Sequence, residues 1–529
     1  MINKEIMDFL EEQTNRIKPL HKDLTHSYWD ATTTGKKESY ERYGLCQKEL
    51  AKFFNNRANF EKIKQFLSIN IDDKLIERQL RLLYNSYLGN QGDLNLINKI
   101  LEKFTAIEEK FNKFRAKING KEFTDNQIKE ILKNETDSVI LQEAWEASKM
   151  QGEFVANDLI ELIKLRNQLA QSLGFKNYYV LSLEANEQTE NEILEIFSKL
   201  DKSTNLIFSE VKKEIDDILS KRYKTSELNP WHYQDLFFQE APHIYNIDLD
   251  DFYKEDIIEK AEKFYSSIGL DVLDIIERSD LYEKPGKYQH AYCMDLDREG
   301  DVRSLMNIKN NEKWMDTVLH ELGHGIYWKY IDKDLPFLIR DTSHTLTTEA
   351  IALLMGRNAK NVSFIKEFCD VKAEEIDKIG ESVRKSLKLR QLIFSRWSQV
   401  MVNFERNLYD NPDQNLNRLW WSLVKKYQLL DFSRDKADWA SKIHFVSSPV
   451  YYHNYLLGEL FASQINNYMA KSILKNKTSK NLDYPGNKEI GEYLKSKIFF
   501  PGALYKWNDL IKHSTGEELN PGYWVNDFC

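Results

Sequence analysis

Helical periodicity dominates this chain. Apolar residues recur at three- and four-residue spacing almost from end to end, as in helices that bury one face. Few stretches alternate as half-buried strands do, so the pattern predicts a mainly α fold. The segments expected to be helical are 4–20, 38–68, 73–118, 126–151, 154–173, 190–222, 250–268, 311–330, 346–358, 364–410, 414–430, 452–475 and 487–497.

No linker divides this helical pattern. The 529 residues include only 20 Gly and 10 Pro, and no low-complexity tract or internal repeat interrupts them. Aromatic residues make up 12% of the chain, which is enough for an extensive core. We therefore expect one compact unit with two lobes around a cleft, rather than independent domains.

One segment departs from the helical pattern. Residues 290–294 and 302–308 are short alternating runs, and the polar turn 297–301 lies between them. This arrangement predicts an antiparallel β-hairpin just before the helical segment 311–330. An exposed strand edge could pair with the backbone of an extended peptide. A purely structural hairpin is the alternative, and the two roles are compatible.

Charge and composition exclude several classes of protein. The net charge of −9 argues against a broadly basic surface for nucleic acid. No apolar run is long enough for a membrane span, and the N-terminus lacks the pattern of a secretory signal. The widely spaced Cys46, Cys293, Cys369 and Cys529 are expected to be reduced thiols of a cytoplasmic protein. Cys293 is interpreted as a small buried residue rather than a nucleophile.

The strongest chemical signal is the motif His320-Glu321-Leu322-Gly323-His324, which lies inside a predicted helix. Positions i and i+4 share one helix face, so both imidazoles can bind one metal ion beside the glutamate. This is the H-E-x-x-H pattern of zinc peptidases, with two ligands and a general base. A solvated face with two unrelated histidines is the alternative, but the apolar flanks predict a largely buried helix.

A catalytic zinc site needs a third protein ligand and one open position. Glu349 lies in the first turn of the next predicted helix, with 24 residues between it and His324. A glutamate near a helix start can also be placed there simply because the helix dipole favours it. His344 is a competing ligand in the preceding loop. We favour Glu349, which gives one zinc ion held by His320, His324 and Glu349.

A second group of polar and aromatic residues lies near the C-terminus, and contains Lys442, His444, Tyr451, Tyr452 and Tyr455. Histidine and tyrosine donors can stabilise the oxyanion that forms when a peptide carbonyl is attacked. Lysine and tyrosine donors also suit a substrate carboxylate. An aromatic helix start that belongs to the core is the alternative interpretation.

Several stretches resemble the helical gluzincin peptidases, most closely the angiotensin-converting enzyme (peptidyl-dipeptidase A) family. Thimet oligopeptidase and oligoendopeptidase F are wider relatives. The stretches are HELGHGIYWKYIDKDLPFLIR followed by TEAI, WWSLVKKYQLL at 420–430, KIHFVSSPVYYHNY at 442–455 and LRNQLAQSLGFKNYY at 165–179. The resemblance implies a large helical ellipsoid with a deep cleft between two lobes. It implies a single metallopeptidase domain over 1–529, in which 1–150 form a helical lid and first lobe, and 151–529 the catalytic body.

The resemblance also implies catalytic roles for particular residues. The zinc ligands would be the two histidines of the motif and Glu349. Glu321 would be the general base that activates water and then protonates the leaving amine. His444 and Tyr455 would stabilise the oxyanion.

Substrate contacts follow from the same resemblance. His290 and Ala291, at the start of the predicted hairpin, would contact the substrate backbone. Lys442 and Tyr452 would bind the C-terminal carboxylate of the peptide, with Gln239 as their partner.

The chain departs from the family at four positions. One extra residue makes either Tyr451 or Tyr452 a match for the family's first tyrosine. The family's aspartate four residues after the third ligand is Leu353 here, so support for a zinc histidine must come from elsewhere, and Asp316 is a candidate. Val424 and Asn454 stand where the animal enzymes have chloride-binding arginines, which argues against chloride activation.

We therefore expect a zinc metallopeptidase that cuts short intracellular peptides and releases C-terminal dipeptides. An oligoendopeptidase that cuts inside oligopeptides is the alternative within the enzyme class. A non-catalytic peptide-binding protein is the alternative outside it, although the motif residues and Glu349 are all present. The natural substrate, the oligomeric state and the native metal are left open.

Overall fold

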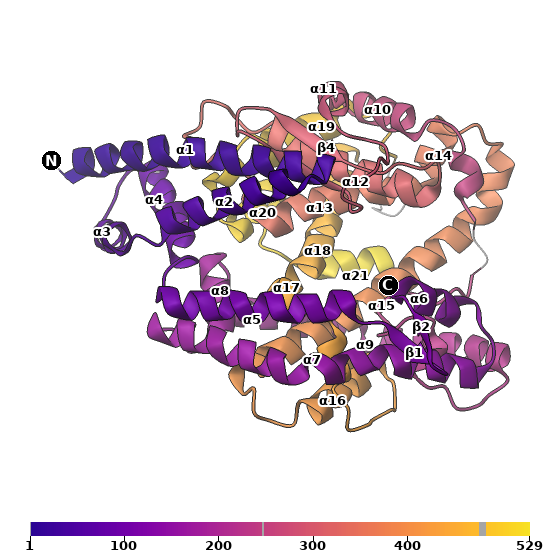
Figure 1. The fold of residues 1–529 in the computed structure, drawn as a ribbon. Coiled ribbons are helices and arrows are strands. Elements are labelled where there is room, and N and C mark those ends of the chain that lie inside the picture. Colours follow the sequence, from indigo (N-terminus) through magenta and orange to yellow (C-terminus); the bar gives the residue numbers. More distant parts are fainter. Residues whose placement is uncertain (1, 246–247, 476–482) are drawn as a thin grey trace.

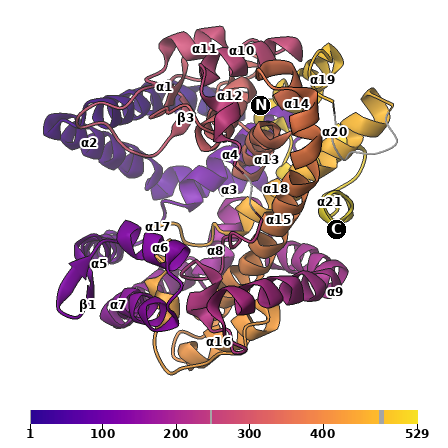
Figure 2. The same ribbon diagram turned by 90° about the vertical axis from the view of Figure 1, so that its right-hand side faces the viewer.

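The computed structural model describes residues 2–245, 248–475 and 483–529. Helices make up most of this part of the chain, and its strands form two small antiparallel pairs. The prediction of a mainly α fold is confirmed. Two layers of helices lie above and below a central region that α15 and α18 cross (Figures 1 and 2).

The upper layer in both views contains the N-terminal helices and the helices that carry the motif. Its helices are α1 (Ile2–Thr34), α2 (Lys37–Phe54), α3 (Arg57–Leu67), α4 (Lys74–Leu88), α10 (Ile257–Ser267), α11 (Leu273–Arg278), α12 (Glu312–Lys329), α13 (Thr345–Gly356), α14 (Val362–Phe368), α19 (Lys488–Leu494) and α20 (Trp507–Thr515).

The lower layer contains most of the helices between residues 94 and 223. Its helices are α5 (Leu94–Lys113), α6 (Asp125–Asn134), α7 (Ser138–Ser172), α8 (Tyr178–Ala185), α9 (Glu190–Tyr223), α16 (Leu416–Gln428) and α17 (His444–Ser447). Between the layers lie α15 (Ala373–Asp410), α18 (His453–Tyr468) and α21 (Gly522–Phe528). Short 3-10 and π turns are η1 (Pro230–Tyr233), η2 (Asp250–Tyr253), η3 (Arg357–Lys360), η4 (Asp438–Ser441), η5 (Met469–Ile473), η6 (Lys495–Phe499) and η7 (Gly502–Leu504).

Several predicted helix boundaries are wrong, and capping residues explain most of the differences. The segment 38–68 is two helices, because Asn56 accepts a hydrogen bond from Asn59 N and begins a new one. The segment 73–118 also divides, where Asp93 caps α5. The segments 126–151 and 154–173 form instead α6 and a long α7, which Asp137 caps. In each case a side-chain oxygen accepts a hydrogen bond from a backbone N–H group in the first turn of the helix.

The first helix is longer than predicted. It continues through Pro19 to Thr34, although proline removes one hydrogen bond from the helix. Buried side chains at Ile17, Thr25 and Trp29 continue its inner face on both sides of the proline. Packing of this face against the rest of the protein therefore maintains the helix.

The predicted hairpin is present with shifted ends. Strands β3 (Tyr292–Asp295) and β4 (Val302–Leu305) pair antiparallel, with Tyr292 opposite Leu305 and Asp295 opposite Val302. His290 and Ala291 lie before β3 rather than inside it. A second hairpin pairs β1 (Ala116–Ile118) with β2 (Lys121–Phe123), and its first strand replaces the end of the helix predicted for 73–118. Its turn contains Asn119 and Gly120 with positive φ, which favours a tight hairpin.

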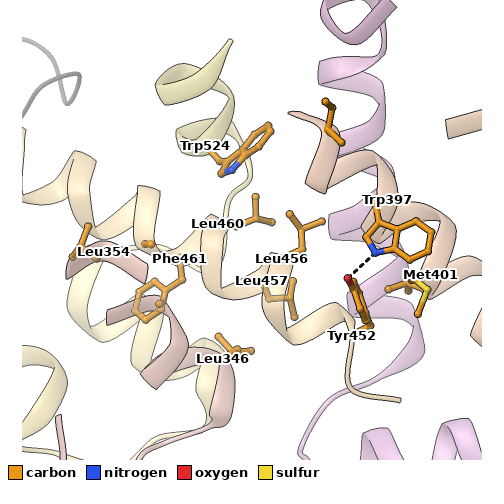
Figure 3. Close-up of a cluster of buried hydrophobic side chains, with 14 of the residues drawn as sticks. Leu346, Leu354, Trp397, Met401, Tyr452, Leu456, Leu457, Leu460, Phe461 and Trp524 are labelled. Atoms are coloured by element: carbon orange, nitrogen blue, oxygen red, sulfur yellow. Dashed lines mark hydrogen bonds between the residues drawn. The ribbon is translucent and has the colours of Figure 1, made fainter. Parts of the chain in front are cut away.

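Two hydrophobic clusters hold the structure. The smaller one joins α1 to α4, and the larger one extends from Ile107 to Phe528. Within the larger cluster, α18 packs against α13, α15 and α21 (Figure 3). Leu457, Leu460 and Phe461 of α18 are fully buried there. Cys46, Cys293 and Cys369 are free thiols, as expected.

Helices α12 and α13 approach each other closely at Gly323. A Cβ atom on Gly323 would lie 2.8 Å from Ala352 Cα, which is closer than packed atoms can come. Only glycine allows this backbone contact.

We expect Gly323→Ala to push α13 away from α12 and to lower the free energy of unfolding by about 1–3 kcal/mol, as overpacking does. Urea denaturation would measure the change. Gly44→Ala is the matched control, because Gly44 lies in α2 with no neighbour within 4 Å of a new Cβ. The control should be neutral or stabilising, by up to about 1 kcal/mol. Equal effects in both variants would contradict the tight α12–α13 contact.

Candidate metal centre

Helix α12 holds both histidines of the motif on one face. It begins after Asn311, whose side chain accepts a hydrogen bond from Trp314 N at 2.9 Å. Its apolar residues are buried in the main cluster, which fixes its rotation. The rings of His320 and His324 are 4.9 Å apart between centroids, in an edge-to-face arrangement.

Helix α13 brings Glu349 to the same place. Because α13 begins at Thr345, Glu349 lies in its second turn. The prediction that Glu349 lies in the first turn is therefore wrong. The helix dipole acts mainly within the first turn, so it does not readily explain why a glutamate stands at this position. The possible ligand atoms of His320, His324 and Glu349 lie within 4.8 Å of one another, and His320 Nε2 is 3.8 Å from Glu349 Oε2.

His344, the competing candidate ligand, instead caps the N-terminus of α13. Its Nδ1 accepts a hydrogen bond from Leu346 N at 3.1 Å, which caps the start of α13. In the described part of the chain, His320, His324 and Glu349 are the group that could hold a metal ion.

Thr348 orients one of the two histidines. Its Oγ1 lies 2.7 Å from His324 Nδ1, so the hydrogen bond leaves Nε2 of His324 available as a ligand. No sequence motif marked Thr348, although it directly precedes Glu349. Asp316 supports His320 only through its charge, which opposes the lowering of the His320 pKa by burial. The Asp316 carboxylate lies 3.6 Å from Lys360 Nζ and 3.7 Å from an Arg390 nitrogen.

The buried charges of this group fit a bound divalent cation. Burial, with a further contribution from the Glu349 charge, raises the pKa of Glu321 to about 8. Burial and then the Glu459 charge raise the pKa of Glu349 to about 7. Burial keeps both histidines neutral by lowering their pKa values. Neutral imidazoles and a carboxylate are the ligands of a catalytic zinc ion, whose charge would also stabilise the buried carboxylates.

A cavity of about 880 Å³ opens beside these residues. Its walls come from α1, α2, α4, the end of α8, the hairpin and α12–α13. The side chains that line it include Ile17, His21, Leu50, Phe54, Leu83, Glu187, Ala291, Cys293, Arg298, His320, Glu321, His324, Trp328, Asp341, Thr348 and Glu349. The N-terminal helices therefore form one wall of the cleft that contains the candidate metal centre.

The start of the hairpin meets this cavity only in part. Ala291 lines it, as do the first residues of β3. His290 is exposed and packs against Tyr288, with ring centroids 5.3 Å apart, outside the lining of the cavity. Burial raises the pKa of the Cys293 thiol, which agrees with an unreactive cysteine.

The structure brings Lys442, Gln239 and Tyr452 together. Lys442 Nζ donates a hydrogen bond to Gln239 Oε1. The ammonium lies over the rings of Trp397, Phe237 and Tyr452, at 5.0, 5.2 and 5.7 Å from their centroids. Burial lowers the pKa of Lys442 to about 8. The contacts of Phe237 and Trp397 with Lys442 could not be predicted from the sequence, because neither residue lies in a recognisable motif.

Aromatic contacts extend from this lysine towards Glu349. The His444 ring lies 5.1 Å from Tyr452, and Tyr455 lies 5.4 Å from Tyr452. Burial and the Glu349 charge raise the pKa of Tyr455. Of the two candidate tyrosines, Tyr452 contacts Lys442 and accepts a hydrogen bond from Trp397 Nε1 at 2.6 Å (Figure 3).

A helical protein with two histidines and a glutamate converging from adjacent helices, beside a further buried glutamate, has the arrangement typical of a metallopeptidase. The sequence model of the family Peptidase M2, described as "Angiotensin-converting enzyme", matches residues 2–230 and 243–521. The chain belongs to this family. Gln239 lies between the two matched segments.

Individual relatives are distant. The angiotensin-converting enzyme of Mesocricetus auratus is 24% identical over 274 residues, which cover 49% of this chain and 20% of that protein. The enzyme of Oryctolagus cuniculus is 26% identical over 274 residues, covering 49% and 21%. The matched region thus spans about a fifth of these relatives. Carboxypeptidase 1 of Bacillus subtilis (strain 168) is 23% identical over 462 residues, covering 82% of this chain and 85% of that protein.

Among the described residues, every helix is too short or too polar to cross a membrane.

We expect Thr348→Val to weaken zinc binding by about 10- to 100-fold, as loss of a hydrogen bond to a ligand histidine does. Valine keeps the shape of threonine but lacks the hydroxyl oxygen that accepts the hydrogen bond from His324 Nδ1. Competition with a chromogenic chelator would give the zinc dissociation constant. Thr317→Val is the control, because the Thr317 hydroxyl bonds only the Lys313 carbonyl on the exposed side of α12. Unchanged affinity in Thr348→Val would contradict the orienting role.

Proposed function

We propose that this protein is a zinc-dependent peptidase that hydrolyses short peptides and releases dipeptides from their C-termini. The observation that carries the proposal is the convergence of His320, His324 and Glu349 beside the buried Glu321. The carboxylate receptor around Lys442 supports the position of the cut. We take the whole chain, 1–529, as one functional unit, in which 1–150 contribute the lid and first lobe.

A zinc ion held by His320, His324 and Glu349 would supply a Lewis acid that polarises the peptide carbonyl and lowers the pKa of water. Glu321 lies beside these ligands, where burial raises its pKa. The charge of a bound cation would oppose this rise and favour the ionised carboxylate that a base requires. Glu321 takes a proton from the attacking water and then delivers it to the leaving amine. A carboxyl with a pKa raised towards neutrality suits both tasks.

His444 and Tyr455 are proposed to stabilise the carbonyl oxygen as it becomes negative. Burial lowers the pKa of His444 to about 4, so the ring is neutral and can donate from one nitrogen. Its Nδ1 is buried without a hydrogen-bond partner among the described residues. The raised pKa of Tyr455 keeps its hydroxyl protonated, and therefore a donor.

The position of the cut is proposed to depend on the C-terminal carboxylate of the substrate. Lys442 is buried among three aromatic rings with Gln239 as its hydrogen-bond partner. A buried ammonium with one neutral partner retains donors for a carboxylate. Ala291, on the cavity wall near the metal site, is proposed to contact the substrate backbone. His290, the residue before it, is proposed to contact the same backbone from outside the cavity lining.

We expect Glu321→Gln to abolish peptide hydrolysis, with a loss of turnover of at least about 100-fold, while zinc stays bound. The amide keeps the size of the side chain but cannot accept the proton. Peptide cleavage and zinc content would be measured on the same sample. Glu277→Gln, at an exposed glutamate of α11, is the control. Retained turnover would overturn the mechanism, and an inactive wild type with bound zinc would indicate a peptide-binding protein.

We expect a ten-residue peptide to be shortened by two residues at a time, and mass spectrometry of the products would show the ladder. Amidation of its C-terminus should reduce kcat/KM by about 30-fold or more, since it removes one partner of a buried charge pair. Steps of one residue would instead indicate a carboxypeptidase, and a single internal cut an oligoendopeptidase.

The variant Lys442→Met tests the carboxylate receptor in the same assay. It should reduce kcat/KM for the free acid about as much as amidation does, and it should have little further effect on the amide. Lys425→Met is the control, because Lys425 is exposed and pairs with Asp431. Additive effects of amidation and Lys442→Met would contradict a direct contact.

A further inference from the structure

A strained residue lies inside the segment that carries the proposed carboxylate receptor. Val450 has a φ of 55°, in the left-handed region, and it is buried. This conformation favours glycine and is rare for a β-branched residue, because the side chain crowds the backbone. Such a residue persists only where its surroundings hold it in place, and residues of this kind concentrate at functional sites.

Glu405 of α15 supplies a contact that holds Val450. Its Oε1 accepts a hydrogen bond from Val450 N at 2.8 Å, and Glu405 is only 3% exposed. Burial raises the pKa of Glu405 to about 8, so the neutral carboxyl predominates at pH 7 and still offers an oxygen as acceptor. Loss of this oxygen would leave a buried N–H group to find another partner, which is costly.

The part of the segment before Val450 is held from another helix. Arg166 of α7 donates hydrogen bonds to Phe445 O at 2.9 Å and to Val446 O at 2.8 Å. These bonds fix α17, which begins at His444, independently of Glu405. The conformation of Val450 then determines how the chain continues from α17 to α18.

The two residues after Val450 are Tyr451 and Tyr452, and by sequence either could match the family's first tyrosine. In the structure, the ring of Tyr452 lies 5.1 Å from that of His444, and its centroid is 5.7 Å from Lys442 Nζ. The ring of Tyr451 instead packs against Tyr455, with centroids 5.2 Å apart. A left-handed residue bends the chain sharply and can absorb one extra residue, as it does in a bulge.

We propose that Glu405 is a positioning residue: by holding Val450 in the left-handed conformation, it places Tyr452, rather than Tyr451, against Lys442 and His444. This inference rests on the carboxylate receptor of the proposed function. Glu405 would act on the choice of substrate through the backbone of Val450, without contact with the substrate itself.

We expect Glu405→Leu to reduce the preference for a free C-terminal carboxylate by about 10-fold, since a small displacement of a binding group is costly. The preference is the ratio of kcat/KM for a peptide acid to that for its amide. Glu405→Gln should keep the wild-type preference, because the amide oxygen can still accept from Val450 N. Adding Val450→Gly to Glu405→Leu should recover most of the loss, because glycine adopts a positive φ without strain.

Gln399→Leu is the matched control for loss of a buried hydrogen bond from α15. Gln399 is also 3% exposed, and it donates one hydrogen bond to a backbone carbonyl, Phe197 O, at 2.7 Å. This variant should lower the unfolding temperature but leave the preference unchanged. A wild-type preference in Glu405→Leu, or an equal loss in Gln399→Leu, would overturn the inference. If Glu405→Leu does not fold, a lost preference in the double variant with Val450→Gly would overturn it too.

Hydrogen exchange of the backbone amides over 442–455 gives a readout that does not depend on catalysis. Exchange should be faster in Glu405→Leu than in the wild type, and unchanged in Glu405→Gln and Gln399→Leu. Unchanged exchange in Glu405→Leu would contradict the hold on Val450. If the wild type cleaves the amide as fast as the acid, the carboxylate receptor of the proposed function fails, whereas faster exchange in Glu405→Leu would still support the role of Glu405.

Discussion

The contact between α12 and α13 is the constraint on which the candidate site depends. Gly323 has no side chain, so the two helices approach until a Cβ would lie 2.8 Å from Ala352. This approach brings two histidines from one helix and a glutamate from the other within 4.8 Å. Gly458 repeats the arrangement one helix further on, where α18 meets α13 beside Glu349. The ligands are therefore positioned by backbone contacts inside the largest hydrophobic cluster, and not by flexible loops.

Burial of two carboxyl groups at this site has an energetic consequence. Glu321 and Glu349 lie with two neutral histidines, where desolvation disfavours the ionised carboxylates. Glu349 faces His320 rather than a lysine or arginine, and Glu321 has no ion-pair partner among the described residues. A divalent cation would supply the missing charge, so that metal binding and the stability of this region are expected to be coupled. Two buried carboxyl groups without a lysine or arginine partner therefore indicate a bound cation more directly than the sequence motif alone.

The sequence predicted the features that depend on local spacing. The His320–His324 pair follows from helix geometry. Glu349 follows from its spacing after the motif, although it lies in the second turn of α13 and not in the predicted first turn. The helix boundaries that failed depended on caps such as Asn56 and Asp93, or on tertiary packing, which carries α1 past Pro19. Residues that act across helix contacts could not be predicted. Gly458 is 109 positions from Glu349 in the sequence, and their contact appears only when α18 packs against α13.

Helix α1 and helix α12 are connected through the turn of the β3–β4 hairpin. One face of α1 presents Lys18, Lys22 and Thr25 to this turn. Lys18 pairs with Glu299, and Thr25 Oγ1 donates to Leu296 O at 2.6 Å. The exposed ion pair contributes little by itself. The buried hydrogen bond and the packing of Trp29 against Leu296 and Leu305 provide the stronger connection.

The same turn is also connected to α12. Arg298 of the turn donates a hydrogen bond to the Asp341 carboxylate, which also accepts one from Trp328 of α12. One series of contacts therefore runs from α1, which lines the cavity, through the hairpin turn to the helix that carries both histidines.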